Sequence, residues 1–149
     1  MKIVNRKFHR DYQELEKYEA GIALSGPEVK SVRMSRMRLE DSFVKILGSE
    51  AYLVNAQISL YERARIPGYD DRRTRKLLLH KKELIRLKTK LQSSKDLTIV
   101  PVSCYNKGDL IKLGIALAKG RKNLDKRRLE KNKDIRRREE REIKEYLKS

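Results

Sequence analysis

The chain is poor in the residues that build metal centres, disulfides and membrane spans. Its 149 residues include one cysteine, Cys104, and two histidines, which excludes an internal disulfide and leaves no closely spaced set of metal ligands. It has no tryptophan, and no apolar run approaches the ~20 residues of a membrane-spanning helix. The residues after Met1 turn polar before the apolar core of a signal peptide could form. We therefore expect a cytoplasmic protein that needs no metal, cofactor or membrane.

Acidic residues are also scarce beside basic ones. Asp and Glu number 21 against 38 Lys and Arg, which gives a formal net charge of +17. An excess of positive charge raises the local concentration of polyanions and speeds their encounter with the protein. The composition therefore predicts nucleic acid as the partner.

The last thirty-one residues, from Lys119 to Ser149, concentrate this charge. They hold fourteen Lys or Arg and seven Asp or Glu, and neither glycine nor proline follows Gly120. Their scattered apolar residues bury too little surface to offset the entropy that ordering costs, although a neutralising polyanion would let the segment form a helix. We therefore expect a nucleic-acid-binding domain over residues 1–122 and a basic tail over residues 123–149 that is disordered when free.

Alternating apolar residues predict a mainly β body. The expected strands cover residues 17–24, 42–47, 50–58, 97–105 and 110–118, with a weaker candidate at 11–15. Gly48-Ser49 suits the turn of a hairpin, and Pro101 indicates an edge or a bulge. Strands joined by short turns pair antiparallel, and about six around a small core favour closure into an oligonucleotide-binding-type barrel. A half-open sheet that carries one helix is the alternative.

Two helices are expected beside these strands. Proline and glutamate within Ser25–Glu28 are signals of a helix start. Leu84, Leu87 and Leu91 share one face of a second helix over residues 80–91, and the three leucines at 77–79 lead into it.

A long polar loop over residues 59–75 separates the hairpin from the second helix. It ends in a dense basic cluster of Arg72, Arg73, Arg75 and Lys76. Arginine forks match phosphate oxygens, and loops of this length in compact domains are usually functional or disordered. We interpret the cluster as a contact with RNA or DNA, and a solvated loop is the alternative.

Further side chains are candidates for contact with nucleic acid. Glu19 could accept a hydrogen bond from a base amino group, although an ion pair with a nearby cation is the simpler interpretation. Tyr12 and His80 could stack on unpaired bases, with a tyrosine at the core rim and a capping or solvent-exposed histidine as the alternatives. The run from Lys119 to Lys122 could hold phosphate, because Gly120 lets the backbone approach closely, and a generic basic exit from the last strand is the alternative.

No arrangement of residues indicates catalysis. Asp70-Asp71 and Glu139-Glu140 are adjacent carboxylates, but both pairs lie among arginines, which lower a carboxylate pKa. Acid–base catalysis needs the opposite shift. Cys104 falls in a strand-like run and fits a small buried residue better than a nucleophile. We therefore expect that the protein is not an enzyme.

Four blocks of residues carry a resemblance to a known family. They are Asn5-Arg6-Lys7 with Tyr12, then Tyr18–Ile22 continuing through Gly26 to Glu28–Arg33, then Arg73–Lys81, and last Ala118–Lys122 followed by Asp125-Lys126-Arg127. In this order and spacing they resemble the small protein B family, the SsrA-binding proteins of bacterial trans-translation. Leu124 stands where that family usually has a ring, and Asp71-Arg72 lacks the proline that often precedes the basic run.

The resemblance implies a fold and two RNA partners. The fold is an antiparallel oligonucleotide-binding-type barrel of about six strands with two or three peripheral helices and a basic C-terminal tail. The family binds the tRNA-like domain of tmRNA and delivers it to the vacant A site of a stalled ribosome, with the tail helical in the empty mRNA channel. We expect the chain to act as a monomer. A structural rRNA-binding barrel or an RNA chaperone is the alternative.

Motif positions and the basic loop together assign residues to each partner. The tmRNA side would include Tyr12, Glu19, Lys30, Arg73, Arg75, Lys76, Leu78, His80, Lys119, Gly120, Arg121 and Lys122. The ribosome-binding tail would include Asp125, Lys126, Arg127, Lys131, Arg136 and Arg137.

Overall fold

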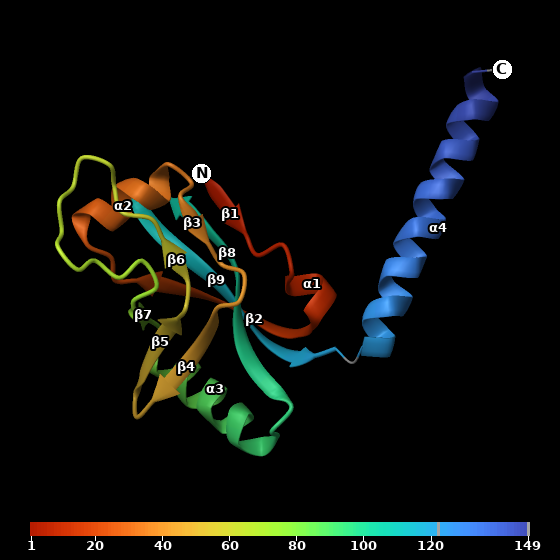
Figure 1. Cartoon of the computed structure of the whole chain (residues 1–149). Helices are drawn as coiled ribbons and strands as arrows, with labels where there is room; N and C mark the ends of the chain where they lie inside the picture. The colour runs from red at the N-terminus through yellow and green to blue at the C-terminus, as the bar shows by residue number, and fades with distance from the viewer. Residues whose placement is uncertain (122, 149) are drawn as a thin grey trace.

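The computed structural model describes residues 1–121 and 123–148, which contain nine strands and four helices (Figure 1). The strands are β1 (Lys2–Val4), β2 (Tyr12–Ile22), β3 (Met37–Arg38), β4 (Phe43–Leu47), β5 (Glu50–Val54), β6 (Gln57–Ile58), β7 (Arg75–Leu78), β8 (Leu97–Lys107) and β9 (Leu110–Gly120). The helices are α1 (Phe8–Asp11), α2 (Gly26–Arg33), α3 (Lys81–Ser93) and α4 (Asn123–Lys148).

Strand β8 closes the barrel because it has neighbours on both sides. The main sheet has the order β1-β8-β4-β5-β7-β2-β9, and β8 also pairs with β9, so six antiparallel strands return upon themselves. Strand β1 extends the sheet beside β8, with Ile3 opposite Cys104. Strands β3 and β6 form a separate two-stranded sheet. The predicted antiparallel barrel of about six strands is confirmed.

Alternation along β9 builds an apolar layer on each side of the sheet. Leu113, Ile115 and Leu117 are buried inside the barrel. The residues between them point outward, and Ala116 and Ala118 are covered by Phe8 of α1 in a second small cluster. This outer cluster fixes α1 over the end of the barrel from which the chain leaves toward α4 (Figure 1).

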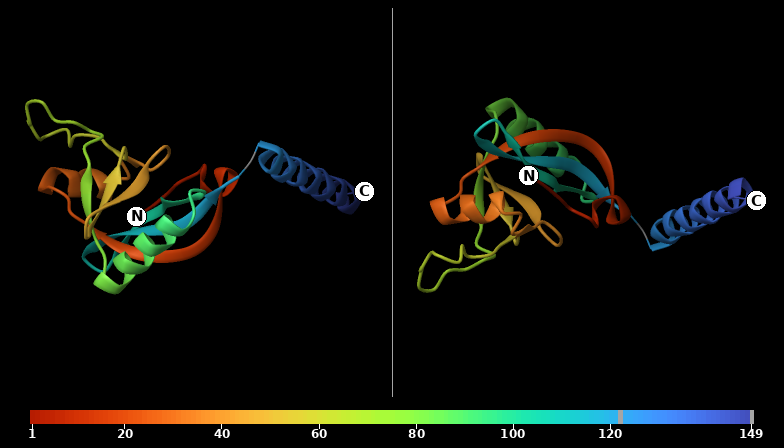
Figure 2. Two further views of the ribbon diagram at one scale, coloured as in Figure 1. Left: turned by 90° about the horizontal axis from the view of Figure 1, so that it is seen from below. Right: turned by 90° about the horizontal axis from the view of Figure 1, so that it is seen from above.

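Capping residues set the starts of α2 and α3. The Ser25 side chain accepts a hydrogen bond from the Glu28 backbone, and the Glu28 carboxylate accepts one from the Ser25 backbone at 3.0 Å, which forms a capping box. At α3, the His80 backbone donates to Glu83. Both predicted helices are present, and α3 lies along the outside of the barrel (Figure 2).

Several predicted boundaries were wrong for local reasons. Residues 50–58 divide into β5 and β6 because Asn55 adopts a φ of 68°, a left-handed conformation that ends a strand. Residues 11–24 contain one long strand, β2, whose register shifts between Glu14 and Glu16. Residues 75–78, expected to lie between a loop and a helix, form β7 between β5 and β2. The bulge indicated by Pro101 is confirmed between Pro101 and Ser103.

The C-terminal segment of the described chain is one long helix, α4, that stands away from the barrel in all three views (Figures 1 and 2). Its described side chains from residue 130 to residue 145 are exposed. The expectation that this segment is disordered in the free protein stays a prediction. Among the described residues, no helix is both long enough and apolar enough to cross a membrane.

Candidate RNA-binding surface

Glu19 lies on the outer face of β2, where two side chains of β8 hold it. Its carboxylate accepts hydrogen bonds from Tyr105 Oη at 2.5 Å and from Lys107 Nζ at 2.9 Å. The bond from Tyr105, followed by the bond from Lys107, lowers the pKa of Glu19. Burial together with Glu19 raises the pKa of Tyr105 to about 12. The simpler sequence interpretation, an ion pair, is therefore confirmed, and the carboxylate stays exposed and ionised.

A shallow hollow of about 340 Å³ opens beside Glu19. It is lined by Lys17, Tyr18, Glu19, Val102, Ser103, Tyr105, Gly114 and Ile115. Gly114 lies opposite both Glu19 and Ser103, and a Cβ there would come within 3.1 Å of Ser103 Oγ and 3.6 Å of the Tyr105 ring. The glycine thus keeps the hollow open. Aromatic rings beside an acceptor and a cation can stack on and hydrogen-bond an unpaired base.

A second hollow, of about 330 Å³, lies around Leu78. The Leu78 side chain is 57% exposed although it covers Gly21, where an added Cβ would come within 3.2 Å of the leucine Cβ. Leu110, 60% exposed, borders the same hollow. His80 is exposed nearby in sequence, at the start of α3. The structure therefore presents Leu78 and His80 to the outside, as contact with RNA would require.

Tyr12 has a structural role that the sequence left open. Its ring is half-buried and stacks on Phe8, with ring centroids 6.0 Å apart. The backbone oxygens of Tyr12 and His9 accept hydrogen bonds from Arg121 Nε at 3.2 and 3.1 Å. Tyr12 is thus a rim residue of the outer cluster, and Arg121 is tied to α1.

Apart from Arg73, which is half-buried, and Arg75, the remaining predicted positions are exposed where their side chains are described. Lys30 lies over the Tyr61 ring, with Nζ 5.1 Å from the ring centroid. Lys76 pairs with Glu50 at 3.1 Å. Lys119 and Gly120 are exposed at the end of β9, and exposed tail side chains include Arg127, Lys131, Arg136 and Arg137. Lys122 lies outside the described residues. Asp125 and Lys126 belong to α4, with side chains outside the described part.

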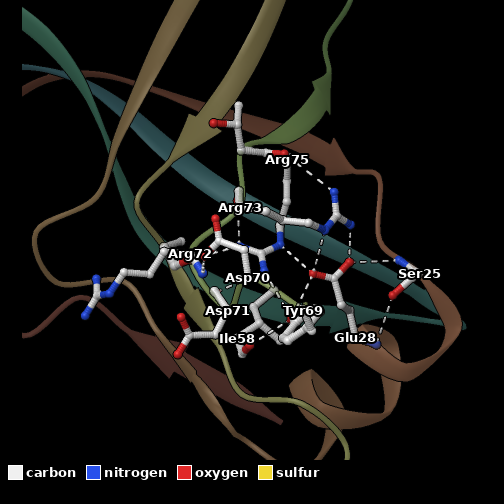
Figure 3. A network of polar contacts seen from close by, with 11 residues as sticks. Ser25, Glu28, Ile58, Tyr69, Asp70, Asp71, Arg72, Arg73 and Arg75 are labelled. Atoms are coloured by element: carbon white, nitrogen blue, oxygen red, sulfur yellow. Dashed lines mark hydrogen bonds and ion pairs between the residues drawn. The ribbon is translucent and has the colours of Figure 1, made fainter. Parts of the chain in front are cut away.

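Arg75 departs from its predicted role because it is buried (Figure 3). Its five N–H groups are all donated within the protein: Nε to Glu28 at 2.7 Å, one Nη to the backbone oxygens of Ala56 and Arg73, and the other to Asp71 O and Tyr69 Oη. No donor is left for phosphate. Arg75 supports the fold of the loop and does not present its guanidinium to RNA.

Glu28 is the centre of this buried network, a role that its position in a capping box did not reveal. It also accepts hydrogen bonds from Arg73 and from Tyr69 Oη, the latter at 3.2 Å (Figure 3). Burial would raise the pKa of Glu28, but hydrogen bonds from Arg73, the Ser25 backbone and Arg75 outweigh it and lower the pKa to about 2. A glutamate at a helix start, followed by an Arg-x-Arg segment, is the sequence signal that could have suggested the pairing.

Two more glutamates form similar groups that the sequence analysis missed. Glu16 accepts from Tyr18 and from Arg86, and Glu50 accepts from Tyr52 and Lys76. Each tyrosine follows its glutamate by two residues, so both side chains lie on one face of the strand. The bond from Arg86, followed by that from Tyr18, lowers the pKa of Glu16 to about 2.

The described residues contain no cluster of three or more His, Cys, Asp or Glu side chains that could hold a metal ion. Cys104 is buried, and burial raises its pKa to about 12, so that its thiol is protonated at neutral pH.

A closed antiparallel barrel, basic on its outside and hollowed beside paired aromatic and charged side chains, defines a small protein of the oligonucleotide-binding class. The family model described as SmpB protein matches residues 2–145. The chain belongs to the SmpB protein family.

Relatives and a solved structure agree with this assignment. The SsrA-binding protein of Carboxydothermus hydrogenoformans is 50% identical over 123 residues, which is 83% of this chain and 82% of the relative. That of Thermosipho melanesiensis is 47% identical over 151 residues, 99% of each chain. A chain of the solved structure "tmRNA-SmpB: a journey to the center of the bacterial ribosome" is 45% identical, with a TM-score of 0.68 over 82% of this chain and 85% of that one.

Proposed function

We propose that this protein is a non-enzymatic, cytoplasmic factor that binds the tRNA-like domain of tmRNA and delivers it to the vacant A site of stalled ribosomes. The observation that carries the proposal is the family match over residues 2–145, together with the likeness to a chain solved with tmRNA and the ribosome. The exposed surface around Glu19 and Leu78 supports it. We expect the protein to act as a monomer.

The tmRNA contacts would come from the barrel. The proposed set is Tyr12, Glu19, Lys30, Arg73, Lys76, Leu78, His80, Lys119, Gly120, Arg121 and Lys122. Glu19 would accept from a base amino group, Leu78 and His80 would pack on bases, and the cations would meet phosphates. Arg75 is left out as a contact because its guanidinium is buried and fully bonded.

The tail would test whether the mRNA channel is empty. A channel lined by rRNA phosphates attracts Arg127, Lys131, Arg136 and Arg137, and an mRNA in the channel would take the same space. Ordering ~20 residues costs on the order of 20–40 kcal/mol of backbone entropy. A long, continuous set of contacts is needed to offset this cost, so we expect the free tail to be disordered and its helix to be stabilised on the ribosome.

The test compares two RNAs and two variants. The wild-type chain should bind the tRNA-like domain of tmRNA more tightly than an unrelated hairpin of equal length, and equal affinities would contradict the proposal. Glu19→Gln should weaken binding to the tRNA-like domain by about tenfold, since one good base contact contributes about 1–3 kcal/mol. Glu16→Gln is the matched control, because Glu16 has the same kind of partners on the same strand, and its affinity should stay within about twofold of wild type.

A further inference from the structure

Residues 59–74, between β6 and β7, form a long connection without strand or helix that is nevertheless held in one shape. Its outer turn is fixed by Pro67 and Gly68: Gly68 has a φ of 71°, and the Tyr69 backbone donates to Ile66 O at 3.2 Å. This is the geometry of a type II turn, which needs a positive φ at its third residue. The chain direction on either side of the turn is therefore defined locally.

The base of this loop is locked by the buried network around Glu28 (Figure 3). The single Tyr69 hydroxyl proton is shared between Ile58 O at 2.8 Å and Glu28 at 3.2 Å. The Ile58 backbone donates to Asp71 O at 2.8 Å. Arg73 and Arg75 reach the same carboxylate from the other end of the loop. One buried carboxylate on α2 therefore holds the second half of the loop, from Tyr69 to Arg73, and Tyr69 in turn links it to Ile58 at the end of β6.

A second set of contacts holds the middle of the loop to α2 and the residues after it. Lys30 lies over the Tyr61 ring at 5.1 Å, and Arg36 pairs with Glu62 at 2.7 Å. The Ser59 backbone also donates to Arg36 O at 3.2 Å. A cation over an aromatic face is attracted by the ring even at an exposed site, so these contacts restrict the loop without burying it.

Two arginines near the turn have no ion-pair or hydrogen-bond partner among the described residues. Arg63 and Arg65 are exposed, and within the described residues their side chains make no hydrogen bond or ion pair. The carboxylates of the loop are engaged elsewhere. Glu62 pairs with Arg36, Asp71 accepts from Gln57 at 3.0 Å, and Asp70 accepts from the Arg72 backbone at 2.9 Å.

We propose that Arg63 and Arg65 form a phosphate-binding tip for RNA, and that Glu28 is the positioning residue that holds this tip in place. The proposal rests on the proposed function, which supplies RNA as the partner. Arginine presents a planar fork that matches phosphate oxygens. A contact on a loop that is already ordered avoids most of the entropy cost of fixing it at binding. The phosphate belongs either to tmRNA or to rRNA, and the two arms of the test separate these sources.

The first experiment measures how affinity depends on salt. The full-length double variant Arg63→Gln/Arg65→Gln is titrated with the tRNA-like domain of tmRNA and, separately, with stalled ribosomes. Loss of two phosphate contacts should reduce the slope of log K against log salt by about 1.4–1.8, because each contact contributes about 0.7–0.9. We expect this reduction in one of the two arms. A slope that is unchanged in both arms overturns the proposal.

The control removes the same charge elsewhere. Lys90, near the C-terminal end of α3, and Lys95, just after that helix, are exposed, and this end of α3 lies away from the loop (Figure 1). Lys90→Gln/Lys95→Gln should leave the slope unchanged in the arm that the tip affects, and an equal reduction would mean that only net charge matters. The proposed function would be contradicted by a different result: the wild-type chain would bind the tRNA-like domain of tmRNA and an unrelated hairpin with equal affinity.

The second experiment tests Glu28 as a positioning residue. Glu28→Gln should speed hydrogen exchange in residues 60–72, and the tip substitutions should weaken RNA binding less in this background than in wild type. Since Arg75 would then be buried beside a neutral partner, Tyr61→Leu is a second variant that loosens the loop without touching the core. Native exchange in β8 and β9 verifies the fold in each case. If Arg63→Gln/Arg65→Gln weakens RNA binding as much in the Glu28→Gln and Tyr61→Leu backgrounds as in wild type, Glu28 is not a positioning residue.

Discussion

At the scale of single residues, four glutamates of the barrel and of α2 are each paired with a cation. Glu16, Glu19, Glu28 and Glu50 each accept from one tyrosine hydroxyl and from at least one Lys or Arg. Negative charge on an RNA-binding surface repels phosphate, and these pairings limit that repulsion. They also keep the glutamates ionised in acid, because hydrogen bonds to the charged form lower a carboxylate pKa.

Glu28 should therefore give the protein a measurable acid sensitivity. Its pKa is about 2 in the folded chain against an ordinary value of 4.5, so the ionised carboxylate adds stability above about pH 4.5 that is lost as the pH falls toward 2. In Glu28→Gln the free energy of unfolding should be lower at pH 6 and should fall less steeply over this window. Urea unfolding at a series of pH values measures this free energy. If it falls in parallel with pH for wild type and for Glu28→Gln, the prediction is wrong.

At the scale of elements, the short helix α1 links the barrel to the start of the tail. Phe8 fills the outer cluster over β8 and β9, and Arg121 donates to backbone oxygens at both ends of α1. Because Phe8 holds α1 in place and Arg121 is bonded to α1, Phe8 also helps to fix the backbone at Arg121, where the basic run begins.

Phe8→Ala should destabilise the protein by about 3–5 kcal/mol, because Phe8 is fully buried and its removal leaves a cavity. Binding of tmRNA should weaken in the fraction that remains folded, since Arg121 would lose its fixed partners. Thermal or urea unfolding gives the first quantity and titration the second. Leu15→Ala, at a residue that is 47% exposed, is the control and should change stability by less than about 0.5 kcal/mol.

Sequence patterns predicted the elements whose residues follow a single local pattern, such as the alternation of a strand or the start signals of a helix. The alternation in β8 and β9 and the proline-led start of α2 identified these elements, and Pro101 identified the bulge. Strand β7 was missed because three successive leucines have no period, and because its first residue is a buried arginine. The same buried arginine explains the error in the site: a solvated Arg75 and a buried one look identical until Glu28, distant in sequence, is brought beside it.

At the scale of the whole molecule, the two basic parts have different environments. The barrel carries its cations beside paired carboxylates, whereas α4 presents exposed cations and contacts the short helix α1. This division predicts that a mutation can abolish the action of the tail on the ribosome without abolishing the binding of tmRNA by the barrel.

A chain that ends at Asp125 should bind the tRNA-like domain of tmRNA with nearly wild-type affinity and should fail to support peptide tagging on stalled ribosomes. The reason is that the truncation removes the tail and leaves every described barrel contact in place. Titration and an in vitro tagging reaction measure the two activities. A large loss of tmRNA affinity would show that the tail belongs to the tmRNA surface. Circular dichroism of the full-length chain against one that ends at Leu124 measures how much helix the free tail holds.

The single cysteine has a practical consequence for following the tail. With its pKa raised to about 12 and its sulfur buried, Cys104 stays almost entirely in the unreactive thiol form at pH 7.5. A second cysteine at an exposed tail position, as in Lys144→Cys, would then react with a maleimide dye essentially alone. Fluorescence anisotropy of that dye could report the moment at which the tail becomes fixed on a ribosome, with the native cysteine left in place.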